Sequence, residues 1–394
     1  MTATASTTRR RLWWVLAAVA LTAACSDPPP PPAAVPTPVV PDISPSATPS
    51  PADCVETAVS RLSLEQKAGQ LLMIGTPVDE PRGLTGEIKR HHLGGVFLAG
   101  RSTRPASALR ADIRALQAAA TTPLLVALDQ EGGSVQTLKG KDFPLIPSAE
   151  RLGRGSQTTL RDEVRGSATR LAAIGVTINL APVADTVPTE VGEDNPPIGN
   201  FHRQYGSDPA AVALDIEQAV AASQDNGVLT VIKHFPGLGR TRANTDTSTN
   251  AVDATATVDD PYLKPFAAGI KAGSASVMIS SASYPKLDDR TIATFSQPII
   301  TGLLREKMGF DGVVMSDDLG AAKAAATIPP GDRAVRFVAA GGDVALSIRP
   351  EDAEPMSEAL IDRARKDPAF AARVTDAAEH VLRAKVKAKQ IPCG

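Results

Sequence analysis

Eight short apolar runs of strand length recur along this 394-residue chain, separated by longer segments with the periodicity of amphipathic helices. Strands that are almost continuous in Val, Ile and Leu and alternate with helices are typical of a parallel sheet covered by helices. The pattern therefore predicts an α/β fold, a single (β/α)8 barrel of the TIM type. The eight runs span residues 70–75, 94–99, 123–129, 177–182, 228–234, 276–281, 312–317 and 343–348.

The segments between the runs decide between one barrel and two open-sheet domains. Helices are predicted within residues 104–120, 149–174, 209–226, 259–272 and 298–308. The alternative is an open sheet split in two, but no GxGxxG turn follows an early strand and no linker interrupts the domain. The polar, Pro-rich and Gly-rich stretch 185–206 is predicted to be a long loop after the fourth strand.

The N-terminus has the layout of a lipoprotein signal peptide over residues 1–24. Arg9–Arg11 precede an apolar segment, Leu12–Ala24, which is shorter than the roughly 20 residues of a membrane-spanning helix. The segment ends in Leu21–Cys25, which resembles a bacterial lipobox and predicts lipid modification of Cys25. The alternative is an ordinary secretory cleavage site. The protein is thus expected in the cell envelope, lipid-anchored to the outer face of the bacterial cell membrane. Sec and Tat export both remain open.

Residues 26–52 contain 11 prolines among Ser, Thr and Ala. Such a composition buries no core and favours extended backbone. We therefore expect a Pro-rich disordered tether over residues 25–52 and a folded domain over residues 53–394. Cys54 and Cys393 lie at opposite ends of this domain, and outside the cytoplasm they are expected to form a disulfide. Two free thiols are the alternative reading.

The charge balance and the histidines exclude several classes of function. With 43 acidic and 41 basic residues, the chain lacks the basic excess of a dedicated nucleic-acid binder. Five scattered histidines show no metal-ligand spacing, so neither a metal site nor a cofactor is expected. A monomer is expected.

Polar residues end three of the apolar runs, where a barrel carries its chemistry. These are Asp129, Lys233 with His234, and Asp317 with Asp318. Any one could be a structural ion pair or a helix cap, as Asp318 could be. Together they are suited to binding sugar hydroxyls. A carboxylate nucleophile with a second acid cleaves glycosidic bonds with retention.

Three motifs resemble family 3 glycoside hydrolases, especially the bacterial β-N-acetylglucosaminidases of the NagZ type: DQEGG at 129–133, KHFPG at 233–237 and GFDGVVMSDDL at 309–319. The resemblance implies a TIM barrel, a covalent glycosyl-enzyme intermediate and substrates with terminal β-linked N-acetylglucosamine, including peptidoglycan-derived muropeptides. It further implies that Asp317 is the nucleophile and that Asp129, Lys233 and His234 bind sugar hydroxyls. Arg203, within residues 198–206, matches the sugar-binding arginine of an IGxRSFG pattern.

Two positions depart from this family pattern. Counted without gaps from Gly239, Asp246 falls where these enzymes usually carry an acid/base histidine, and no histidine lies within 237–260. Asp246 is therefore the predicted proton donor, since burial can raise the pKa of a carboxylic acid. The alternatives are that His202 takes over, that activity is weakened, or that Asp246 only orders its loop. Thr137 stands where the family often has an arginine.

These departures leave other functions open. The same barrel could act as a β-glucosidase or as a glycoside phosphorylase. The missing loop histidine also allows a glycan-binding lipoprotein without turnover, although retention of Asp317 and of the full KHFPG motif argues against it.

Overall fold

The computed structural model describes residues 29–30 and 51–392 and contains one parallel eight-stranded sheet in the order β10-β1-β2-β3-β6-β7-β8-β9. Met315 of β9 pairs in parallel with Val344, directly before β10, so the sheet closes on itself. Each predicted apolar run overlaps one of these strands, which confirms the (β/α)8 barrel, although β1 and β7 extend past the predicted ends at residues 75 and 234. The strands are β1 (Leu72–Pro77), β2 (Gly95–Ala99), β3 (Leu125–Leu128), β6 (Ile178–Asn179), β7 (Leu229–Phe235), β8 (Ser276–Ile279), β9 (Val313–Ser316) and β10 (Ala345–Ser347).

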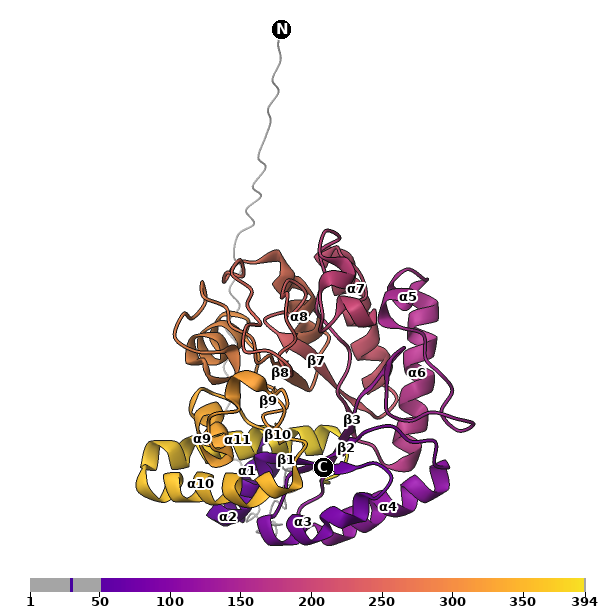
Figure 1. Cartoon of the computed structure of the whole chain (residues 1–394). Coiled ribbons are helices and arrows are strands. Elements are labelled where there is room, and N and C mark those ends of the chain that lie inside the picture. The colour runs from indigo at the N-terminus through magenta and orange to yellow at the C-terminus, as the bar shows by residue number, and fades with distance from the viewer. Residues whose placement is uncertain (1–28, 31–50, 393–394) are drawn as a thin grey trace, which may run out of the picture. The chain divides into compact units, whose positions relative to one another are not determined.

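Helices surround the strands (Figure 1). They are α1 (Pro51–Ser60), α2 (Leu64–Gln70), α3 (Thr85–His91), α4 (Ala106–Ala119), α5 (Ala149–Gly153), α6 (Gln157–Ile174), α7 (Pro209–Gln224), α8 (Lys264–Lys271), the π-helical η6 (Pro298–Lys307), α9 (Pro330–Ala339), α10 (Ala353–Lys366) and α11 (Pro368–Lys387). The helices predicted within 104–120, 209–226 and 298–308 are confirmed. The stretch 185–206 is a loop with two short 3₁₀ turns, as predicted.

Two predicted helices differ in their bounds. The segment 149–174 forms α5 and α6, because Ser156 accepts a hydrogen bond from Thr159 N and so caps a new helix. The helix predicted over 259–272 begins only at Lys264. The 3₁₀ turn η4 (Pro261–Leu263) precedes it, with Asp260 as its cap.

The apolar core has two main layers, one inside the barrel and one between the sheet and its helices. Val381 and Ala384 of α11 pack in the interior layer. Gln390, just beyond α11, donates to the carbonyl of Leu124, and Lys387 donates to that of Gly273. Leu124 directly precedes β3 and Gly273 lies three residues before β8, so α11 closes the amino-terminal end of the barrel. A functional site is therefore expected at the opposite end, where the strands have their carboxyl ends.

The first and last helices pack together. Val55 and Val59 of α1 contact Leu382 of α11, and Figure 1 shows α10 and α11 (yellow) beside α1 and α2 (indigo). Cys54 Sγ lies 3.6 Å from the carbonyl oxygen of Pro392. Cys393 lies outside the described residues, so its pairing with Cys54 stays a prediction.

The predicted signal peptide, Cys25 and nearly all of the predicted tether also lie outside the described residues. Helix α1 begins at Pro51, so the last two residues assigned to the tether lie in its first turn. In residues 29–30 and 51–392, no helix is long and apolar enough to cross a membrane.

Asp343, just before β10, is a fully buried charge that ties three segments together. It pairs with Arg305 of η6 at 2.5 Å, with Arg373 of α11, and with His380 Nδ1 at 3.1 Å. Burial raises the pKa of Asp343, but the hydrogen bond from His380 and the charges of both arginines outweigh this and lower it to about 2. The charged carboxylate therefore stabilises the fold.

Replacing Asp343 with Asn should lower the free energy of unfolding by about 3–5 kcal/mol, because two arginines lose a buried partner. Chemical denaturation at pH 7 measures this. The folded pKa is depressed, so the contribution is complete above the unfolded pKa near 4 and is lost as the pH falls toward 2. The difference in the free energy of unfolding between wild type and variant should therefore disappear as the pH falls from about 4 to about 2. Asp162→Asn, which removes an exposed pair with Arg165, is the control and should change stability little. A pH-independent gap would contradict the assignment.

Candidate active site

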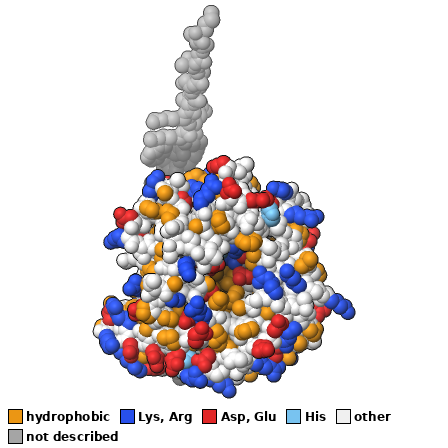
Figure 2. Space-filling view, in the orientation of Figure 1, with side chains coloured by type: hydrophobic (Ala, Val, Ile, Leu, Met, Phe, Trp, Pro, Cys, Tyr) orange, Lys and Arg blue, Asp and Glu red, His pale blue; other side chains and the backbone are white. Residues whose placement is uncertain are grey.

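A cavity of about 270 Å³ opens at the carboxyl ends of the strands, and all six residues predicted to act on a sugar line it. They are Asp129, Arg203, Lys233, His234, Asp246 and Asp317. Its apolar wall includes Phe97, Leu180, Met278 and Leu346, which belong to the interior layer of the barrel. Figure 2 shows a hollow with acidic and apolar side chains near the middle of the face, where the strands of Figure 1 converge.

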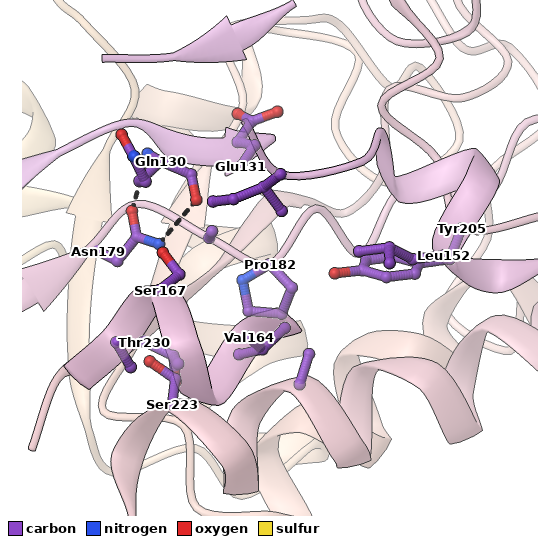
Figure 3. A pocket seen from close by; sticks show the side chains of 14 residues that line it. Gln130, Glu131, Leu152, Val164, Ser167, Asn179, Pro182, Tyr205, Ser223 and Thr230 are labelled. Carbon is purple, nitrogen blue, oxygen red and sulfur yellow. Dashed lines mark hydrogen bonds between the residues drawn. The ribbon is translucent and has the colours of Figure 1, made fainter. Parts of the chain in front are cut away.

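A second cavity lies behind the barrel wall, between the sheet and helices α6 and α7 (Figure 3). It is bordered by the hydrogen-bonded pair Gln130 and Asn179 and by the ring of Tyr205. Its volume of about 30 Å³ suits a buried water, whereas small-molecule sites reach about 300 Å³. The mouth of the barrel is therefore the candidate site.

Lys233 and His234 end β7, and both side chains line the mouth cavity. The peptide bond between them is cis. Lys233 Nζ lies 2.7 Å from Asp129 Oδ1 and 2.6 Å from Glu131 Oε1. Burial lowers the pKa of Lys233, but the charges of Asp129 and Glu131 outweigh this and raise it above its ordinary value. Lys233 is thus a fixed cation that holds Asp129 at the edge of the cavity.

Glu131 joins this group although the sequence analysis gave it no role. It accepts from Arg203 Nε at 2.8 Å and from Arg203 Nη2 at 2.7 Å, besides its contact with Lys233. Burial raises the pKa of Glu131, but the charges of Arg203 and Lys233 lower it to about 2. In the sequence, only its place inside the DQEGG motif indicated that Glu131 belongs to the site.

An unpredicted hairpin, β4 (Gln130–Gly132) with β5 (Val135–Gln136), carries Glu131. Its turn needs glycine, because Gly132 has a φ of 108° and a Cβ there would lie 2.4 Å from the carbonyl of Pro147. Arg203 reaches the same carboxylate from the long loop after β6, where its Nη1 also donates to Pro197 O at 2.8 Å. Arg203, which was assigned from the family pattern, is therefore held in a defined position in the structure.

Asp185 orients His234 and was also missed. This fully buried carboxylate lies 2.7 Å from His234 Nδ1 and accepts from the backbone N–H of Leu238 at 2.7 Å. His234 Nε2 remains on the cavity side, 3.5 Å from Arg203 Nη2. Asp185 lies in the loop after the fourth strand, three residues beyond the predicted run 177–182, so the rule that singled out Asp129 and Asp317 did not reach it.

Asp317 follows β9 and faces the cavity. Its backbone N–H donates to Ile279 O at 3.0 Å, and its Oδ1 accepts from Asp318 N at 2.8 Å. Asp318 in turn accepts from the backbone N–H groups of Gly320 and Ile348, which orders the loops after β9 and β10. Burial and the charge of Asp317 raise the pKa of Asp318 to about 6, against these backbone donors.

Asp246 lies on the loop after β7, and its backbone N–H is held by Asn244 Oδ1 at 2.9 Å. The residue as a whole is exposed to solvent, yet it lines the cavity. Burial and the nearby charge of Asp317 raise the pKa of Asp246, against the charges of His234 and Arg203. The structure thus brings a second carboxylate close enough to Asp317 for their charges to interact.

The other two residues raised by the sequence lie elsewhere. His202 Nδ1 is 3.0 Å from Glu150 Oε2, and His202 is not among the residues that line the cavity. Thr137 is buried, and its hydroxyl donates to the carbonyl of Asp129. Neither residue therefore occupies the position of a proton donor or a sugar ligand in this arrangement.

The described residues hold no group of three or more His, Cys, Asp or Glu side chains arranged to bind a metal ion. What the cavity does offer is two interacting carboxylates, Asp317 and Asp246, beside a set of hydrogen-bonding side chains. Lys233 and His234 can donate to hydroxyl oxygens, whereas Asp129 can accept from hydroxyl groups. Such an arrangement can bind one sugar unit and carry out acid and nucleophilic chemistry on it.

The family model of the glycosyl hydrolase family 3 N-terminal domain matches residues 63–384. β-Hexosaminidase LpqI of Mycobacterium tuberculosis is 31% identical over 332 residues, covering 81% of each chain. The crystal structure of a β-N-acetylhexosaminidase from Beutenbergia cavernae is 46% identical, with a TM-score of 0.81, and covers 82% of this chain and 99% of the other. The solved M. tuberculosis LpqI is 26% identical, with a TM-score of 0.72 and coverages of 85% and 96%. The resemblance seen in the motifs is confirmed: this chain is a glycoside hydrolase and belongs to glycosyl hydrolase family 3.

Proposed function

We propose that the protein is a retaining exo-β-N-acetylglucosaminidase that removes terminal N-acetylglucosamine from peptidoglycan-derived glycans. The observation that carries the proposal is the pair Asp317 and Asp246 in one cavity with Asp129, Lys233 and His234. A cavity of about 270 Å³ suits one terminal sugar, which favours exo action. The β-N-acetylhexosaminidases similar to this chain support the choice of sugar.

In the first step, Asp317 attacks the anomeric carbon while Asp246 protonates the glycosidic oxygen, and the aglycone leaves. The hydrogen bond from Asp318 N leaves the second oxygen of Asp317 for the attack. Burial and the charge of Asp317 raise the pKa of Asp246, which favours the protonated form that a general acid needs. Asp129, Lys233 and His234 hold the hydroxyl groups and fix the sugar against Asp317.

In the second step, Asp246 as a carboxylate takes a proton from water, which attacks the anomeric carbon and frees Asp317. Hydrolysis is favoured over phosphorolysis by the charge of the cavity. Both cations, Lys233 and Arg203, are already paired with Asp129 and Glu131. In the glycosyl-enzyme Asp317 is an uncharged ester, so it is the carboxylate of Asp246 beside the anomeric carbon that would repel a phosphate anion.

A non-catalytic glycan-binding lipoprotein was the alternative from a different class, and membership of a family of glycoside hydrolases argues against it. Its support was the missing loop histidine. The position of Asp246 in the cavity, with a pKa raised by burial and by Asp317, weakens that support because it supplies an acid where the histidine is missing. Activity on β-glucosides remains a second enzymatic candidate, and comparing glucosides with N-acetylglucosaminides in the same assay separates the two.

Replacing Asp317 with Asn should abolish turnover of a chromogenic N-acetyl-β-glucosaminide, because no glycosyl-enzyme can form. We expect a fall in kcat/KM of at least about 10⁴-fold, by analogy with removal of other covalent nucleophiles. The variant should keep its unfolding midpoint and still bind the product sugar through Asp129 and Lys233. Turnover retained by Asp317→Asn would remove Asp317 as the nucleophile.

Replacing Asp246 with Asn should distinguish between leaving groups. With a poor alkyl aglycone, kcat/KM should fall about 10²–10⁴-fold, the usual contribution of a general acid. A dinitrophenyl aglycone leaves without protonation, so its glycosylation step should be nearly unaffected. For the wild type, kcat/KM with the alkyl aglycone should fall as pH rises through the raised pKa of Asp246, and this limb should disappear in the variant. Equal losses on both substrates would contradict the acid role.

We further propose that lipid modification of Cys25 anchors the enzyme to the outer face of the cell membrane and that the Pro-rich segment spaces the barrel from it. The lipobox-like Leu21–Cys25 supports this proposal. Cys25→Ala should abolish incorporation of labelled fatty acid into the protein while leaving its activity unchanged, measured by metabolic labelling of expressing cells. Labelling of the Cys25→Ala variant equal to that of the wild type would contradict lipid modification of Cys25.

A further inference from the structure

The loop that carries Asp246 has no helix or strand of its own between β7 and the 3₁₀ turn at Pro261. Asp246 itself is exposed to solvent, and its backbone N–H is held within the loop by Asn244. A general acid must lie within hydrogen-bonding distance of the atom that it protonates. The contacts that fix this loop therefore decide whether Asp246 can act.

One side chain of the loop, Arg240, forms an extensive set of charged contacts. Its Nε lies 2.8 Å from Asp253 Oδ2, and its Nη2 pairs with Asp260. The guanidinium carbon lies 4.3 Å from the centre of the Tyr262 ring, a cation–π contact. Both carboxylates are almost fully buried, at 2% and 5% exposure, so these pairs are screened little by solvent.

The partners of Arg240 are themselves anchored to the barrel. Asp253 donates its N–H to Ser283 O in the loop after β8, and its Oδ1 accepts from the backbone of Thr255. Asp260 caps η4 by accepting from Tyr262 N, and η4 leads directly into α8. Arg240 therefore ties the start of the Asp246 loop to the loop's own end, where rigid elements begin.

Further contacts hold the loop on either side of Arg240. Asn195 Nδ2 donates to the carbonyls of Leu238 and Thr241, each at 2.8 Å. Gly239 passes so close to Thr186 that a Cβ would lie 1.8 Å from its carbonyl oxygen. Beyond Arg240, the carbonyl of Thr245 accepts from Lys323 N at 2.9 Å, which joins the Asp246 loop to the loop that follows Asp317.

From this arrangement we propose that Arg240 is a positioning residue for catalysis, which clamps the loop so that Asp246 stays at the glycosidic oxygen. The inference rests on the proposed role of Asp246 as the acid. Arg240 acts through the backbone, because the charges that influence Asp246 are those of Asp317, His234 and Arg203. A fixed loop serves both steps, since the same carboxyl group must first give a proton to the aglycone and then take one from water.

The test compares Arg240→Ala with wild type on N-acetyl-β-glucosaminides that carry an alkyl or a dinitrophenyl aglycone. Displacement of the acid by about 1 Å costs on the order of 10²-fold in rate, so kcat/KM for the alkyl substrate should fall by about that factor. For the dinitrophenyl substrate it should fall less than about threefold, because departure of that group needs no acid. Arg240→Lys keeps the charge but not the forked geometry, and it should recover part of the loss.

Arg305→Ala is the matched control. Arg305 is also a largely buried arginine that pairs with a buried aspartate, Asp343, but at the amino-terminal end of the barrel. The Arg305→Ala variant should have a lower unfolding midpoint. At a temperature where it is folded, its kcat/KM should change equally for both substrates. If Arg240→Ala lowers kcat/KM equally for both substrates, or for neither of them, the positioning role is overturned.

Asp246→Asn on the same two substrates separates this inference from the function on which it rests. A leaving-group difference in Asp246→Asn but not in Arg240→Ala refutes the clamp alone. No such difference in Asp246→Asn refutes the acid assignment and the clamp together. A wild type that turns over neither substrate refutes the proposed function itself.

Discussion

The carboxylate of Glu131 holds the candidate site together. Its two oxygens receive Arg203 from the loop after β6 and Lys233 from the end of β7. All three side chains are largely buried, so each charge depends on the others for compensation. The position of Asp129 follows, because Lys233 holds it at 2.7 Å. One glutamate on a short hairpin thus fixes the geometry of two cations and of Asp129 at the edge of the cavity.

The side of the cavity that carries Asp317 and Asp246 differs from the side around Glu131, because its carboxylates have no cation paired with them among the described residues. Asp317 and Asp246 interact with each other, and each raises the cost of a second negative charge beside it. Burial adds to this effect at Asp246 and at Asp318, whose pKa rises to about 6. The result is a division of roles within one cavity. The paired charged groups are suited to holding a sugar, whereas carboxyl groups of raised pKa are suited to exchanging protons.

Sequence alone predicted the barrel and part of the site, for a physical reason. Strands of a parallel barrel are buried on both faces, so they read as apolar runs, and the polar residue that ends such a run faces the rim. Asp129, Lys233, His234 and Asp317 followed from that rule. Arg203 and Asp246 lie within loops, where only the family motif indicated their positions.

What the sequence did not predict depends on contacts between distant segments. Glu131 meets Arg203 across 72 residues, and Asp185 meets His234 across 49. The break between α5 and α6 depends on one serine cap, which the apolar periodicity does not register. Likewise, the pairing of Arg240 with Asp253 and Asp260 is invisible in a polar loop sequence, because many other acidic residues are available as partners.

The proposed mechanism passes through a covalent glycosyl-aspartate, and trapping that intermediate shows whether it forms. The wild-type protein is incubated with an activated fluorosugar that slows breakdown of the intermediate, then digested and analysed by mass spectrometry. We expect one sugar per chain, attached to the peptide that contains Asp317. An adduct on another residue, or none under conditions where a chromogenic N-acetyl-β-glucosaminide is turned over, would contradict it.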